Sequence, residues 1–99
     1  MTITLVLANE PAYNHQVKVY PNPSKGIFTV EIEEIANGKD AKTLEVIDIM
    51  GRSIFQKHIE TSGGKHYEII DISGQATGQY FLRITGKNGD EVQKVIKEN

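Results

Sequence analysis

The sequence predicts an all-β domain, an antiparallel β-sandwich of about seven strands. Apolar and polar residues alternate in short runs, as where Phe28, Val30 and Ile32 fall on one face of a strand. Gly, Pro, Asn and Asp separate these runs at intervals of roughly 8 to 12 residues. No segment shows a convincing helical repeat. Short strands at regular spacing are typical of a sandwich.

The most apolar run, residues 43–49, is expected inside a sheet. It has Leu44 and Val46 on one face and Ile47 and Ile49 on the other. A tight glycine-containing turn then joins it to the next run as a hairpin. The expected strands are residues 17–20, 27–33, 43–49, 52–59, 66–71, 79–85 and 91–97.

A tyrosine near the start of the sixth expected strand refines the fold class. Gly78-Gln79-Tyr80 follows a loop of small and polar residues, the setting of a tyrosine corner, in which the phenol bonds to upstream backbone. The alternative is an ordinary strand tyrosine. A corner favours an immunoglobulin-like sandwich with Greek-key connections.

The first expected turn is rigid. Pro21 and Pro23 each remove a backbone donor and fix φ, and the residues before them are pushed away from helical angles. Gly26 can adopt a positive φ, which suits the return into a strand. Chemistry of this kind is also found in simple stiff loops, so the turn indicates function only together with other motifs.

Composition bounds the organisation and the partners. Ninety-nine residues make one domain, and 11 basic and 13 acidic residues (net charge −2) argue against nucleic acid or an anionic membrane as the main partner. Without cysteine there is no disulfide, thiol nucleophile or thiolate metal site. Residues 9–16 read as a linker, and residues 2–8 could add an edge strand. We expect the domain to span 17–99, and Met1 to be an artificial start on a piece of a longer precursor.

No pattern of catalytic or metal-binding residues is visible, so we expect neither an enzyme nor a cofactor. His58 and His66 flank one expected turn, but two histidines without a third ligand are more often surface residues. Asp48, Asp71 and Asp90 could be acid/base groups or calcium ligands. Their places beside turns favour bonds to nearby backbone amides instead.

Five segments stand in a distinctive order: VYPNPSKGIFTV (19–30), VIDIMGR (46–52), DIS (71–73), GQYFLRI (78–84) and KVIK (94–97). From about residue 17 to the end, their order and spacing resembles the type A C-terminal sorting domain of the bacterial type IX, or Por, secretion system. The resemblance implies an immunoglobulin-like, non-catalytic domain at the end of a large exported Bacteroidetes protein. It implies passage through the periplasm, recognition by the outer-membrane translocon, and usually removal upstream by a sortase-like peptidase. The cargo then reaches the cell surface or the medium.

The same resemblance implies the residues of the recognition motif. The chain departs from the family pattern at Ile72, where leucine is usual, and in having three residues after the last motif residue. Removal of the domain is expected within residues 9–16. The matching residues are Pro21, Asn22, Pro23, Gly26, Asp48, Gly51, Gly78, Tyr80, Lys94, Val95 and Ile96.

The last expected strand is the natural place for a partner to bind. Backbone groups on an edge strand can pair with a partner strand, and Lys94 and Lys97 discourage indiscriminate pairing. A weak edge-to-edge dimer stays open. The alternative function is a small adhesive or carbohydrate-binding sandwich that binds through a face, for which Tyr13, Tyr20 and Tyr67 leave room.

Overall fold

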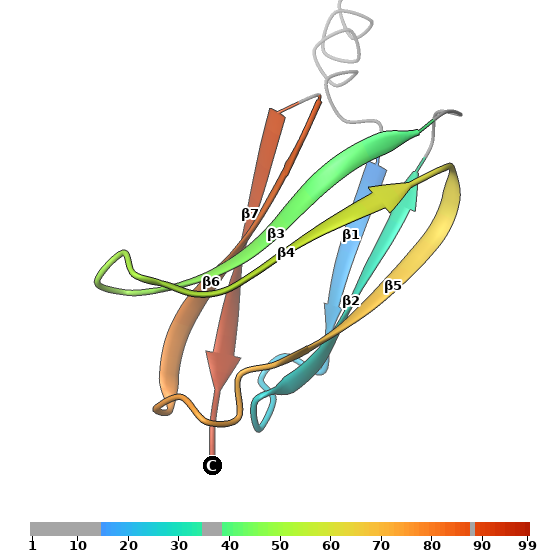
Figure 1. Ribbon diagram of the computed structural model, residues 1–99. Coiled ribbons are helices and arrows are strands. Elements are labelled where there is room, and N and C mark those ends of the chain that lie inside the picture. The colour runs from blue at the N-terminus through green and yellow to red at the C-terminus, as the bar shows by residue number, and fades with distance from the viewer. Residues whose placement is uncertain (1–14, 35–38, 88) are drawn as a thin grey trace, which may run out of the picture.

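Seven strands form two antiparallel sheets in the computed structural model, which describes residues 15–34, 39–87 and 89–99 (Figure 1). One sheet has the order β1-β2-β5 and the other β4-β3-β6-β7. In the lettering of immunoglobulin-like folds these are A-B-E and C′-C-F-G, so the expected sandwich is confirmed. The strands are β1 (His15–Tyr20), β2 (Ile27–Glu34), β3 (Asp40–Asp48), β4 (Ser53–Thr61), β5 (Gly64–Asp71), β6 (Gly78–Gly86) and β7 (Gly89–Lys97).

Alternate residues of both sheets meet in one core. Phe28, Val30 and Ile32 of β2 are at most 1% exposed, as the period-two pattern predicts. β3 lies between β4 and β6, in agreement with its apolar character on both faces. The remaining buried apolar residues are Leu44, Val46, Ile70, Ile72, Tyr80, Leu82, Ile84 and Val95.

β3 differs from the expected strand at both of its ends. It begins at Asp40 rather than at Thr43, because Lys42 is buried in an ion-pair cluster. It ends at Asp48, whose side chain captures the following backbone amides, so Ile49 stands 69% exposed in the turn. The expectation that Ile49 contributes to an apolar strand face was therefore wrong.

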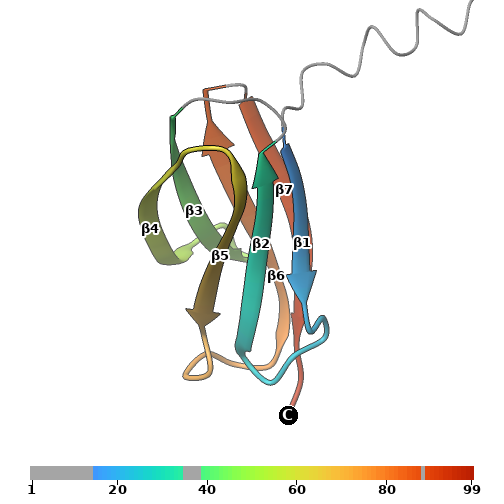
Figure 2. The same ribbon diagram turned by 90° about the vertical axis from the view of Figure 1, so that its right-hand side faces the viewer.

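The chain enters and leaves the described domain at opposite ends. β1 begins at one end of the sandwich, and β7 runs to the carboxyl terminus at the other (Figures 1 and 2). β1 starts at His15, two residues before the expected boundary. The expected edge strand at residues 2–8 lies outside the described residues.

Candidate functional site

Two motif segments that are more than 70 residues apart in sequence meet at the carboxyl-terminal end. The Asn22 side chain donates from Nδ2 to the Lys94 carbonyl (2.8 Å) and accepts at Oδ1 from the Ile96 amide (2.9 Å). An amide side chain thus pairs with β7 as a residue of a neighbouring strand would. Both flanking prolines are exposed, and both of their peptide bonds are cis.

The next residues of the same turn continue this pairing. The Ser24 amide donates to the Ile96 carbonyl (3.0 Å), and the Glu98 amide donates to the Ser24 carbonyl (2.8 Å). Ser24 forms a parallel bridge with Lys97. The outer edge of β7 is therefore covered from Lys94 to its end, although β7 is the last strand of its sheet.

Position 26 requires glycine for two independent reasons. Its φ is +116°, a conformation that L side chains rarely adopt. A Cβ at this position would also lie 2.6 Å from the Ser73 Cα. The Gly26 carbonyl accepts the Ile72 amide (2.7 Å), so this glycine joins the first turn to the loop before β6.

A second group of motif residues surrounds the β3–β4 turn. The Asp48 carboxylate accepts from the Met50 and Arg52 amides (both 2.9 Å) and from Arg52 Nε (2.8 Å). The Arg52 amide is the main cause that holds the pKa of Asp48 below its ordinary value. Gly51 takes a φ of +89° in the turn and donates its amide to the Asp48 carbonyl (3.0 Å). The expectation that this aspartate caps a turn is confirmed.

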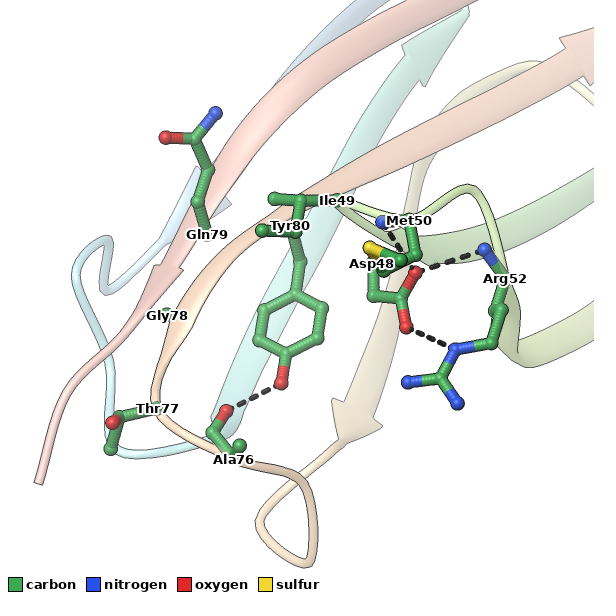
Figure 3. Close-up of a pocket in the computed structure, with 9 residues that line it drawn as sticks. All are labelled: Asp48, Ile49, Met50, Arg52, Ala76, Thr77, Gly78, Gln79 and Tyr80. Carbon is green, nitrogen blue, oxygen red and sulfur yellow. Dashed lines mark hydrogen bonds and ion pairs between the residues drawn. The ribbon is translucent and has the colours of Figure 1, made fainter.

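The tyrosine corner adjoins that turn. Tyr80, 5% exposed, donates its hydroxyl to the Ala76 carbonyl, as the sequence predicts. A pocket of about 200 Å³ lies between the β3–β4 turn and residues 76–80, and it includes Gly78 and the Tyr80 ring (Figure 3).

The predicted motif residues thus fall into two groups, and β6 and β7 connect them. Tyr80 pairs with Val95, whose side chain is fully buried in the core. Asp71 lies apart, and its Oδ1 caps the Ser73 amide at 2.8 Å. His58 and His66 belong to different sheets, so no hairpin brings them together. Among the described residues, no three His, Asp or Glu side chains gather as a metal site requires.

Sequence reasoning missed a buried charged cluster. The Lys42 ammonium lies 2.7 Å from Asp40 and 3.1 Å from Glu34, and all three side chains are at most 6% exposed. Burial works against the lysine cation, but the two carboxylates outweigh it and raise the Lys42 pKa. Lys42 is in alternation with Leu44 and Val46, which would have placed it on the inner face of the strand. The charged residues among 39–42 instead favoured a start of the strand at residue 43.

The outer face of the β1-β2-β5 sheet carries an exposed patch. Tyr20 (43% exposed) donates its hydroxyl to Glu31 at 2.9 Å. Tyr67 and Ile69 (54% and 70% exposed) also lie on this face, so the strand face that the sequence assigns to both is the outer one.

In the part of the chain that is described, no helix is long and apolar enough to cross a bilayer.

Comparison with known proteins gives relatives much longer than this chain. An endo-acting ulvan lyase of Formosa agariphila is 26% identical over 80 residues, which are 81% of this chain and 14% of the lyase. This chain therefore spans about one-seventh of that protein.

Solved structures share the fold. Dimeric latent PorU from Porphyromonas gingivalis matches 85% of this chain with 9% of its own, at a TM-score of 0.68 and 20% identity. A β-glucuronidase of glycoside hydrolase family 2 matches 87% of this chain with 11% of its own, at a TM-score of 0.53 and 13% identity.

The family comparison is specific. Residues 18–98 match the model of the secretion system C-terminal sorting domain, and this region contains both groups of motif residues. The chain belongs to the C-terminal sorting domains of the type IX secretion system and acts as a secretion signal on a larger cargo protein.

Proposed function

We propose that the outer-membrane type IX translocon recognises this domain in its folded form, at the end of the sandwich where its sequence motifs meet. The cargo precedes residue 15, and a sortase-like peptidase cuts the precursor within the part of residues 9–16 that precedes β1. The precursor passes through the periplasm, and the cargo is delivered to the surface or the medium. The domain itself contributes binding and no catalysis.

The observation that carries the proposal is the pairing of Asn22 and Ser24 with the last strand. Four hydrogen bonds hold the backbone of residues 94–98 against the first turn. These residues cannot act as a loose terminal peptide unless those bonds break. A translocon component that binds residues 94–98 in this arrangement must therefore bind the folded domain.

The same bonds limit where a partner strand can pair with β7. Backbone groups alternate sides along a strand, so Asp90 and Val92 face the same outer side as Lys94 and Ile96. The turn covers only the later pair. Edge pairing therefore belongs to the amino-terminal half of β7, before Lys94.

The position of the chain ends supports a translocon contact at the carboxyl-terminal end. β1 begins at the end of the sandwich opposite the carboxyl terminus (Figures 1 and 2). A cargo joined ahead of β1 and a translocon component at the carboxyl-terminal end approach opposite ends of the sandwich. A contact at the carboxyl-terminal end therefore does not displace the cargo, whereas a strand paired with the amino-terminal half of β7 lies at the end where the cargo joins.

A reporter fused ahead of the chain tests the proposal in a host with type IX secretion. The intact fusion should reach the surface or the medium. Val92→Pro removes only an outward-facing amide, so the domain should stay folded while edge pairing is blocked. Full delivery of this variant would contradict edge pairing, and failure of the intact fusion would contradict the sorting role.

One observation favours binding through a face as a second candidate function. Tyr20 and Tyr67 are exposed on the same side of the β1-β2-β5 sheet, as in an aromatic platform for a saccharide. Tyr20→Ala combined with Tyr67→Ala should abolish retardation of the chain in polysaccharide-containing gels if this surface binds sugar. Equal mobility of the intact chain with and without polysaccharide would rule that function out.

A further inference from the structure

We propose that the β3–β4 turn and the pocket beside it form a docking site for a protein segment that presents an apolar side chain next to a carboxylate. This inference rests on the proposed function, since the partner is the translocon that recognises the sorting domain. It adds a contact separate from the edge of β7.

The turn is rigid, yet it holds two large apolar side chains in water. Asp48 accepts two backbone amides with its carboxylate and a third with its carbonyl, and its own amide donates to the Arg52 carbonyl (2.9 Å). Ile49 and Met50 at the tip are nevertheless 69% and 78% exposed. Neither side chain contributes to the core, so the bonds order a surface that the domain does not need for its own packing. Ordering before binding lowers the entropic cost of association.

The adjoining pocket has the size and lining for one side chain. Its volume of about 200 Å³ is below the usual range of small-molecule sites. Ile49 and Met50 line it from the β3–β4 turn, and Ala76, Thr77 and Tyr80 line it from the segment that leads into β6 (Figure 3). An apolar anchor residue seated in a pocket of this kind is the usual centre of a protein interface.

The charge beside the pocket indicates which residue stands next to the apolar anchor in the partner. The Asp48 side chain is 11% exposed, whereas the Arg52 side chain is 77% exposed, so the ion pair presents its positive partner to solvent. Arg52 bonds Asp48 through Nε (Figure 3). A guanidinium in this position fits a carboxylate of the partner.

The chain offers a matched pair of variants as a test. Ile49→Thr and Ile69→Thr make the same change at residues that are 69% and 70% exposed, one at the pocket and one on the outer sheet face. In reporter fusions to the whole chain, Ile49→Thr should reduce the rate of delivery about tenfold, the loss typical of an interface anchor. Ile69→Thr should deliver like the unaltered chain, and both should unfold at the same temperature.

Equal delivery by the two variants would overturn the docking site and leave the sorting role intact, because the unaltered fusion reports that role separately. Arg52→Glu tests the carboxylate contact and should also lose about tenfold. Loss with Ile49→Thr but not with Arg52→Glu would overturn the acidic part of the proposal.

A competition experiment excludes a defect in cargo folding. The chain without a reporter, produced in excess, should reduce delivery of the unaltered fusion by occupying the partner. About tenfold more of the Ile49→Thr chain should be needed for the same effect. Equal competition by the two chains would contradict the proposal.

Discussion

Replacement of Asn22 by alanine should loosen the last strand without disturbing the core. The change removes two hydrogen bonds, to the Lys94 carbonyl and from the Ile96 amide. Each is worth about 1 kcal/mol net, and both lie at the surface, where water can replace them in part. We expect the free energy of unfolding to fall by 1–2 kcal/mol, which corresponds to about 10 °C in the midpoint for a domain of this length.

Amide hydrogen exchange locates the effect at a single residue. The Ile96 amide is bonded to Asn22, whereas Val95 faces β6 within the sheet. In Asn22→Ala, exchange at Ile96 should accelerate much more than exchange at Val95. Lys25→Ala, an exposed change in the same turn, serves as the control and should alter neither amide.

Two results would refute this reasoning. Unchanged exchange at Ile96 would show that the Asn22 side chain does not protect the edge of β7. A loss of stability below about 0.5 kcal/mol, the range of ordinary surface substitutions, would show that the first turn does not secure the last strand.

Three further predictions concern the frame around the motif. Tyr80→Phe should cost 1–2 kcal/mol in urea denaturation, because the carbonyl before β6 loses its donor, and an unchanged midpoint would exclude the tyrosine corner as a stabilising bond. Lys42→Met should cost about 3–5 kcal/mol by removing the ammonium that two buried carboxylates share, and a loss below about 1 kcal/mol would contradict the cluster. Asp48 has a lowered folded pKa, so its stabilisation is present above the unfolded value of about 3.9 and is lost as pH falls through the folded value. Asp48→Asn should therefore flatten the fall in stability as the pH is lowered below about 4, and an identical slope would contradict the cap.

The sequence predicted the class of fold because local patterns carry it. Alternation in β2 and β6, glycine at turns and the position of Tyr80 are local features with one structural outcome each. The same patterns predicted about seven strands, and the described residues form seven. The two ends of β3 were predicted wrongly, at residues 43 and 49 instead of Asp40 and Asp48. Side-chain interactions of Lys42 and Asp48 determine these ends.

The site was predictable as a set of motifs but not as an arrangement. Nothing local to the first turn indicates that Asn22 pairs with residues more than 70 positions later. Nor does the turn at Asp48 indicate that a pocket forms against Ala76 and Tyr80. Both depend on contacts between sheets or strands distant in sequence, and these follow from the assembled sandwich.

The most direct test of the central claim compares two fusions in a host with type IX secretion. One reporter carries the whole chain, and the other carries only residues 89–99, which contain β7 and the terminal motif. We expect delivery of the first and retention of the second, because the last strand has its recognised form only against β6 and the first turn. Delivery of the short fusion at the rate of the whole chain would show that a linear peptide is read and would contradict the account.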